Sequence, residues 1–217
     1  MRPPSSCGSC GTEIRWRDNV PLLSYALLRG RCRHCDVRIS LTYPLVEALT
    51  GLLVVACFAV WGATAEAALA AAFCSVLVVL SVIDANERVV PNRLVLPAAG
   101  FVLVAHTALD PSVRWLAWAL AGAGVLLLAG LANPTGLGMG DVKLALLLGA
   151  MLGSAVMVAL VLGLLAAVAP AAVLVSRRGV SARKTGIQLV PFLSFGAVVA
   201  LFFGDAIANA YVGFLFL

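Results

Sequence analysis

The sequence predicts an all-α polytopic membrane protein with about seven transmembrane helices and a small N-terminal head in the cytoplasm. Composition is the first reason: 62% of the 217 residues are hydrophobic and only 12% are charged. The mean hydropathy of +1.05 excludes an ordinary soluble globular protein. The second reason is the repeated occurrence of apolar stretches, and the third is a pair of cysteine pairs that precedes all of them.

Apolar stretches near the bilayer-spanning length of about 20 residues recur seven times. They cover residues 42–62, 65–83, 94–109, 113–132, 142–152, 156–175 and 190–217, and the third and fifth are short. The first forty residues are polar and basic, and the run after them is too long for the apolar region of a signal peptide. We therefore expect the first span to remain as an anchor, with a head at 1–40 and a membrane-embedded domain at 41–217.

The basic residues predict the orientation, because Lys and Arg in short loops are retained in the cytoplasm. With a cytoplasmic N-terminus, all of the fifteen Lys and Arg residues except Arg114 fall on the cytoplasmic side. The cytoplasmic set is Arg2, Arg15, Arg17, Arg29, Arg31, Arg33, Arg38, Arg88, Arg93, Lys143, Arg177, Arg178, Arg183 and Lys184. The net charge of +5 is then a topology signal, and we expect no nucleic-acid partner.

Four cysteines in the head have the spacing of a metal site. Cys7 and Cys10 are separated by two residues, as are Cys32 and Cys35, with 21 residues between the pairs. Each pair can supply half of a tetrahedral zinc site, whereas a reducing cytosol disfavours disulfides. The intervening segment predicts the short turns and strands of a zinc-ribbon-like module. Four thiolates would close the coordination sphere, so we expect the zinc to be structural. The alternatives are two unrelated thiol pairs or a labile disulfide.

Two aspartates stand at predicted cytoplasmic helix ends. Asp84 ends the second span, and Asp141 follows Gly138 and Gly140 just before the short fifth span. Ionisable residues beside the bilayer are costly and mark function. The glycines permit unusual backbone angles and the close approach of an extended substrate, so we interpret Gly138 and Gly140 as a substrate loop.

Two carboxylates brought together beside an apolar slab share a proton, and this arrangement predicts an aspartyl-protease dyad. One aspartate then takes a proton from the attacking water while the other donates to the scissile carbonyl. Structural alternatives exist for each residue alone: Asp84 can cap a helix or pair with Arg88, and Asp141 can cap the next helix. Two other protein classes also stay open, namely a zinc-bearing membrane scaffold or assembly factor and an Asp-dependent ion transporter.

The blocks around both aspartates resemble the type IV prepilin peptidases, the GxGD class of membrane aspartyl proteases. Three parts of the chain carry the resemblance, which covers nearly its whole length: the block Gly138-Met139-Gly140-Asp141-Val142-Lys143-Leu144 with Leu148-Gly149-Ala150-Met151-Leu152-Gly153, Asp84 with Pro91-Asn92-x-Leu94, and the cysteine head followed by Tyr43-Pro44-Leu45-Val46-Glu47. For Glu47 the resemblance implies a packing or conformational role, and no chemistry.

The resemblance implies a specific activity at the inner (plasma) membrane. It implies cleavage, on the cytoplasmic side, of the basic leader of type IV prepilins or type II secretion pseudopilins, after a glycine and before the apolar helix. Many members also methylate the new N-terminus with S-adenosylmethionine, so that cofactor and activity are further expectations.

The sequence departs from the family pattern in two places. Members usually have one more span before the cysteines, so either a helix is absent here or the sequence begins late; methyltransferase function is the activity that this puts in doubt. Near the C-terminus, Gln188-Leu189-Val190-Pro191-Phe192-Leu193 keeps the family's Pro-Phe-Leu but lacks the preceding Phe-Gly. Substrate positioning is therefore expected to differ there.

Overall fold

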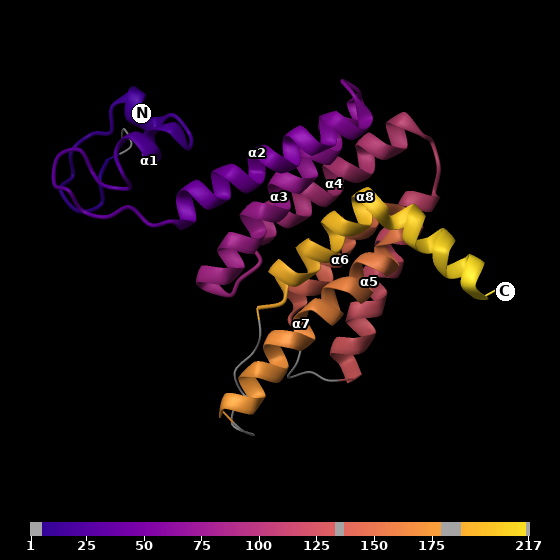
Figure 1. Cartoon of the computed structure of the whole chain (residues 1–217). Coiled ribbons are helices and arrows are strands. Elements are labelled where there is room, and N and C mark those ends of the chain that lie inside the picture. The colour runs from indigo at the N-terminus through magenta and orange to yellow at the C-terminus, as the bar shows by residue number, and fades with distance from the viewer. Residues whose placement is uncertain (1–5, 133–136, 179–187, 216–217) are drawn as a thin grey trace.

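The computed structural model describes residues 6–132, 137–178 and 188–215, and this part of the chain is mostly helical (Figure 1). The head contains a 3-10 turn at Trp16–Asn19 and the short helix α1 at Leu23–Leu27. Seven longer helices follow: α2 Thr42–Trp61, α3 Ala65–Glu87, α4 Asn92–Leu109, α5 Arg114–Ala132, α6 Met139–Leu152, α7 Val156–Arg178 and α8 Val190–Leu215. Each of the seven predicted apolar segments corresponds to one of them.

Five segments of the described chain are long and apolar enough to cross a membrane: α2, α3, α4, α5 and a run of 35 residues that joins α6 to α7. α8 adds a shorter apolar stretch, Val190–Gly204. A straight helix of 35 residues would be about 52 Å long, far beyond a hydrocarbon core of about 30 Å. The run is interrupted at Gly153, whose φ of 56° is left-handed and suits glycine. The chain turns back there, and α6 and α7 pack against each other. The prediction of an all-α, multi-pass membrane protein is confirmed.

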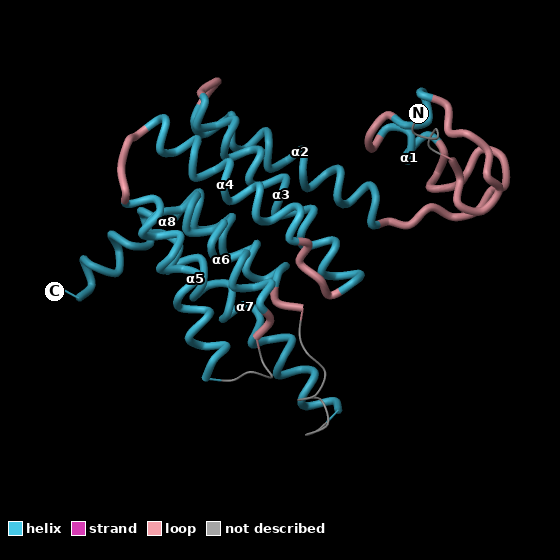
Figure 2. Tube along the Cα trace, turned by 180° about the vertical axis from the view of Figure 1, so that it is seen from behind, coloured by secondary structure: helices cyan, strands magenta, loops and turns pink. Residues whose placement is uncertain are grey.

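Helix ends alternate between two faces of the bundle. The first residues of α2, α4, α6 and α8 and the last residues of α3, α5 and α7 lie on the side of the head (Figures 1 and 2). Arg88, Arg93 and Lys143 are therefore on the head side, and Arg114 is at the opposite face. Arg2, Arg183 and Lys184, which the charge argument also used, lie outside the described residues.

The core lies between α3, α6 and α8. Its largest fully buried side chains include Phe73, Leu77 and Leu80 of α3, Leu144, Leu147 and Leu148 of α6, and Leu193 of α8. Leucines and valines on the outer faces of α2 and α5 are exposed in the protein alone. In a bilayer these side chains face lipid, so their exposure carries no penalty.

Glycines bring the helix backbones close together. A Cβ added to Gly149 would overlap the carbonyl oxygen of Trp118 in α5, and one added to Gly196 would overlap that of Ala159 in α7. Small residues at helix contacts are the usual means of close packing in membranes, where association gains little from the hydrophobic effect. These two glycines explain why α5 packs on α6, and α7 on α8, along much of their length.

The head is built from two matching turns. In each, the first cysteine's N–H donates to the carbonyl five residues on, and its own carbonyl accepts from the residue four on, at 2.9–3.0 Å. That fourth residue, Gly11 in one turn and Asp36 in the other, is left-handed, with φ of 68° and 57°. The strands expected for the module are reduced to two isolated antiparallel bridges, Ser6 with Glu13 and Arg31 with Arg38.

One hydrogen bond ties the head to the first membrane helix. The backbone N–H of Leu22 donates to Glu47 Oε2 at 2.8 Å, and Glu47 lies in the second turn of α2. Through this bond the exposed Glu47 side chain links the head to α2. The head consequently sits beside the first turns of α2.

Candidate active site

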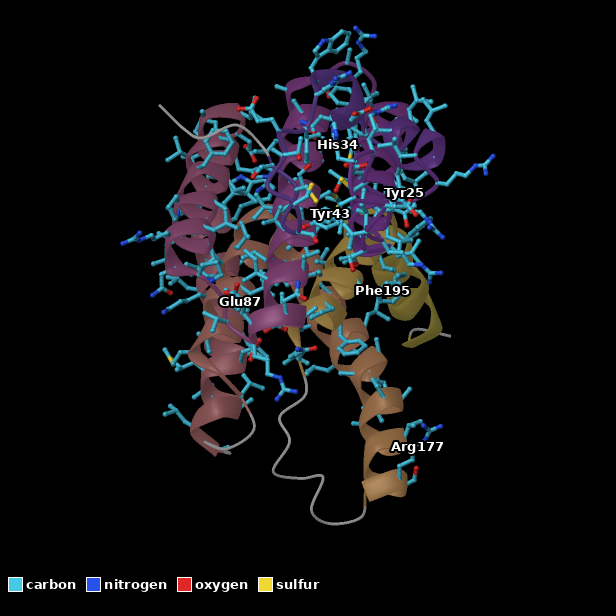
Figure 3. The ribbon with its side chains drawn as sticks, turned by 90° about the vertical axis from the view of Figure 1, so that its left-hand side faces the viewer. Tyr25, His34, Tyr43, Glu87, Arg177 and Phe195 are labelled. Atoms are coloured by element: carbon cyan, nitrogen blue, oxygen red, sulfur yellow. The ribbon has the colours of Figure 1, made fainter. Side chains whose placement is uncertain are left out.

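Asp84 lies inside the last turn of α3. The sequence suggested that the span ends at this residue, but α3 continues to Glu87, which Figure 3 labels at the helix end. The extension is capped locally, because Asn86 Nδ2 donates to Val82 O at 2.8 Å and Arg88 adopts the left-handed conformation that terminates helices, with φ of 57°. Asp84 is therefore held by a regular helix.

The carboxyl group of Asp84 is buried, with 6% of the residue exposed. Within the described part of the chain, Asp84 Oδ2 has no hydrogen-bond partner. A buried oxygen without a partner is unusual in a native protein and is a feature of sites that bind or react.

Asp141 is the third residue of α6. Its Oδ2 accepts from the backbone N–H of Gly138 at 3.1 Å, and its own N–H donates to Gly138 O at 3.1 Å. An acidic residue at this position satisfies one of the free donors at a helix start. The local reason for this placement is therefore helix capping, which was the structural alternative, and it also fixes the direction of the side chain.

The two glycines before Asp141 have different surroundings. A Cβ on Gly140 would lie 2.8 Å from Cγ2 of Val90, in the link between α3 and α4, whereas one on Gly138 would meet only ordinary contacts. Neither has a positive φ, so the unusual backbone angles that the sequence suggested are not present. The visible role of Gly140 is to let the start of α6 approach the segment that follows Asp84.

Both aspartates line one cavity of about 330 Å³ at the head side of the bundle. The other lining residues are Arg88, Val89, Val90, Asn92, Gly138, Gly140 and Lys143. The structure thus brings together residues that are 57 positions apart in the chain.

Sequence analysis did not identify Arg88, Asn92 and Lys143 as parts of the site. Lys143 Nζ donates to Asn92 Oδ1 at 2.7 Å, and Gln188 Nε2 donates to the carbonyl oxygen of Ala85, next to Asp84, at 2.9 Å. Asn92 and Lys143 belonged to the blocks that carried the resemblance, and this was the available signal. Their pairing depends on the packing of α4 against α6, which no local pattern reveals.

The four head cysteines form a second cluster. Their sulfur atoms all lie within 4.8 Å of one another, with Cys7 Sγ and Cys35 Sγ 3.8 Å apart. Figure 3 shows the yellow sulfur atoms gathered between the labelled His34 and Tyr43. Tetrahedral zinc with Zn–S bonds of about 2.3 Å requires sulfur separations of about 3.8 Å, so the cluster fits a zinc ion.

The surroundings of two of these thiols favour the thiolate that zinc requires. Hydrogen bonding to the Thr12 hydroxyl, and then to the Thr12 backbone, lowers the pKa of Cys10 to about 6. The backbone N–H groups of Cys35 and His34 lower the pKa of Cys32. The backbone N–H of Val37 lowers the pKa of Cys35, but burial and the neighbouring thiols outweigh it and raise that pKa to about 11.

Comparison with known proteins gives a consistent result along the chain. Residues 1–61 match the bacterial peptidase A24 N-terminal domain, and residues 71–176 match the type IV leader peptidase family. The prepilin leader peptidase/N-methyltransferase of Burkholderia pseudomallei (strain 1026b) is 37% identical over 93% of this chain and 68% of its own length. The Bacillus subtilis protein of the same name is 32% identical over 98% of this chain and 86% of its own length, and that of Aeromonas hydrophila is 36% identical over 98% and 76%. No solved structure matches significantly. With both of its regions matched and relatives of this identity aligned over most of its length, the chain belongs to the type IV leader peptidase family.

Proposed function

We propose that the chain is a membrane aspartyl endopeptidase that cleaves the basic leader of type IV prepilins or type II secretion pseudopilins, with Asp84 and Asp141 as its catalytic dyad. The observation that carries the proposal is that both carboxyl groups line the same cavity. The names of the relatives, prepilin leader peptidase/N-methyltransferase, support the substrate class.

The proposed chemistry follows from two acids that share a proton. The ionised aspartate takes a proton from a water molecule as the water attacks the scissile carbonyl carbon. The protonated aspartate donates to the carbonyl oxygen, and the proton gained by the base then passes to the leaving amine. Burial of Asp84 and its unpartnered Oδ2 suit a carboxyl group that exchanges a proton with the substrate.

The position of the cavity suits this class of substrate. A leader cut before an apolar helix presents its scissile bond close to the membrane surface, and the cavity lies between the end of α3 and the start of α6, at the head side of the bundle. We assign the head side of the bundle to the cytoplasm of the inner membrane, because Arg88, Arg93 and Lys143 lie on that side. On this basis the head, residues 1–40, precedes a membrane-embedded peptidase domain, residues 41–217.

The dyad is tested by replacing Asp84 and Asp141 separately with Asn, which keeps the shape of the side chain and removes the acid. Each purified variant is reconstituted with a recombinant prepilin, and the product is identified by its mass and N-terminal sequence. We expect both variants to be folded and to lose cleavage, whereas a Glu87→Gln control, outside the cavity lining, cleaves normally. Full processing of the prepilin by either Asp variant would exclude the dyad. If cells that carry either variant assembled their pili or secretion system normally, the scaffold alternative would be favoured.

We further propose a structural zinc ion on Cys7, Cys10, Cys32 and Cys35. Bound there, zinc supplies only a cross-link between the two turns, because four thiolates leave no open coordination position. The head then becomes a fixed element beside the first turns of α2.

A second candidate function is N-methylation of the new N-terminus with S-adenosylmethionine. A cavity of about 490 Å³ between the head and α2 favours it, since this volume is typical of a site for a molecule of that size. Tyr25, Tyr43 and Glu13 are among its lining residues and offer aromatic faces and a carboxylate to an adenosyl group and a positive sulfonium, which carries the activated methyl group.

The cofactor proposal is tested by direct binding of S-adenosylmethionine to the full chain, measured by calorimetry. We expect Tyr43→Ala to weaken binding and Trp16→Ala, an exposed aromatic outside the cavity, to leave it unchanged. Absence of binding by the wild-type protein with zinc bound would exclude this site.

A further inference from the structure

The two helices that carry the aspartates are joined through intermediaries. α4 and α8 each pack against both α3, which carries Asp84, and α6, which carries Asp141. The separation of the two carboxyl groups therefore depends on how firmly α4 and α8 hold α3 and α6. A rigid link at the cavity itself would have the largest effect on this separation, because it constrains the two carboxyl groups directly and not through the length of a helix.

Such a link is present between α6 and α4. Lys143 lies two residues after Asp141, and its Nζ donates to Oδ1 of Asn92 at 2.7 Å across a sequence separation of 51 residues. Asn92 is the first residue of α4, and the short link 88–91 joins it to the end of α3. The hydrogen bond thus closes a ring from Asp84 through Asn92 and Lys143 to Asp141, around a cavity that all four line.

We propose that Lys143 and Asn92 are positioning residues that hold the Asp141 carboxyl group in register with Asp84. This inference rests on the proposed peptidase function. The charge of Lys143 alone does not explain the arrangement, because its described partner is a neutral amide, and no salt bridge of Lys143 occurs among the described residues. A neutral acceptor orients the ammonium group and leaves its charge in place.

The contact between Gly140 and Val90 determines how closely the start of α6 approaches the α3–α4 link. Gly140 lets the first turn of α6 close on the α3–α4 link, and the Lys143–Asn92 hydrogen bond fixes the turn that follows. A directional hydrogen bond from a charged donor resists displacement of this turn of α6 relative to the start of α4. Loss of the bond is expected to misplace Asp141 by a fraction of an ångström to about one ångström.

A displacement of this size is measurable, because misplacing a catalytic group by about 1 Å costs on the order of 100-fold in rate. We expect Asn92→Ala and Lys143→Met each to lower kcat by about 10- to 100-fold with KM changed by less than about twofold. The double variant should be no slower than either single variant, since both remove the same bond. Asn92→Asp should retain more activity than Asn92→Ala, because a carboxylate accepts the same bond.

The control is Arg93→Met, which removes a cation from the neighbouring, exposed position of α4 outside the cavity lining. It should keep wild-type kcat. Thermal unfolding of every variant separates a positioning role from a structural one, because a structural defect lowers the melting temperature together with the active fraction. Wild-type kcat in Asn92→Ala, or additive losses in the double variant, would overturn the proposal, as would a loss of kcat that Asn92→Asp does not restore.

A measurement independent of activity keeps this inference separate from the proposed function. Spin labels carried by unnatural amino acids at Glu87 and Met139, two exposed positions outside the cavity lining, report the distance between the end of α3 and the start of α6. We expect Asn92→Ala to broaden or shift this distance distribution and Arg93→Met to leave it unchanged. An unchanged distance distribution in Asn92→Ala would contradict the positioning role, whatever the activity of the protein. Failure of the wild-type protein to cleave a prepilin would instead contradict the peptidase proposal.

Discussion

The head and the bundle are held together by opposite means. Among the described residues before Thr42, only Ser24 and Gly30 are buried, and the head relies on its cysteine cluster and on ion pairs such as Arg33 with Asp18. The bundle has a continuous apolar core and helices that touch at glycines. A region with too few residues to build a core needs a metal cross-link, whereas helices in lipid need close contact between backbones.

This difference predicts that the two regions are destabilised by different substitutions. A large side chain at a helix contact should unfold the bundle, whereas loss of the cysteine ligands should unfold the head alone. Four experiments, in decreasing order of expected effect, examine the comparison.

Gly149→Leu should prevent the bundle from folding. Its side chain would have to occupy the position of the Trp118 carbonyl oxygen, and a main-chain atom in a packed helix cannot move aside, so we expect a loss of at least about 4 kcal/mol. Size-exclusion profiles and circular dichroism in detergent measure this. The matched control is Gly124→Leu on α5, where an added Cβ meets nothing within 4 Å; equal behaviour of the two variants would refute the packing argument.

The double variant Cys7→Ser, Cys32→Ser should lose its zinc and leave the bundle folded. We expect metal content to fall from about one atom per chain to none, and trypsin to cut the head arginines faster, while the main thermal transition shifts little. Cys57→Ala, which removes a buried thiol of α2, is the control and should keep the metal. Stoichiometric zinc in the double variant would exclude the proposed site.

Gln188→Ala should slow the peptidase without unfolding it. Its Nε2 donates to Ala85 O, a carbonyl near the end of α3 where helical partners are lacking. Losing a neutral hydrogen bond of about 1 kcal/mol predicts a fall in kcat of about fivefold. Asn86→Ala removes the same kind of bond within α3 alone and should have a smaller effect. The reverse order would show that the contact of Gln188, just before α8, with α3 does not position Asp84.

Asp18→Asn should cause the smallest change and affect only the head. The Arg33 guanidinium, by hydrogen bonding and then by charge, lowers the pKa of Asp18. Stability from this carboxylate is therefore fully present above its unfolded pKa of about 4 and lost only as pH falls further. We expect the variant to release zinc to a chelator modestly faster, by a ratio that stays constant between pH 8 and pH 5. If the ratio of the zinc-release rates of variant and wild type fell to one near pH 6, the lowered pKa of Asp18 would be contradicted.

Periodic and local features of this protein were predictable, and long-range ones were not. Apolar length located the seven longer helices of the described chain, though not the short α1, and spacing identified the four cysteines. Both patterns depend only on residues that are near one another in the sequence. The end of α3 was misplaced by a few residues, since hydropathy does not register the Asn86 and Arg88 caps. Gly138 and Gly140 suggested a loop because glycine is rare inside helices, yet α6 begins at Met139.

The candidate site shows the same division. Sequence blocks singled out Asp84 and Asp141, but the contacts that link their helices, Lys143 with Asn92 and Gln188 with Ala85, join residues 51 and 103 positions apart. Such contacts depend on which helices pack against each other, and close contacts at positions such as Gly149 and Gly196 contribute to that choice. A single sequence does not show directly which helices are neighbours.

The shortness of α6 also has a consequence for biosynthesis. A helix of 14 residues is too short to partition into the bilayer as an independent span, and the left-handed Gly153 follows it directly. We therefore expect α6 to enter the membrane together with α7, as a hairpin with Gly153 at its tip. A bulky or charged residue at that tip would act during synthesis, and its effect would be seen as missing protein, with no slow enzyme left to assay.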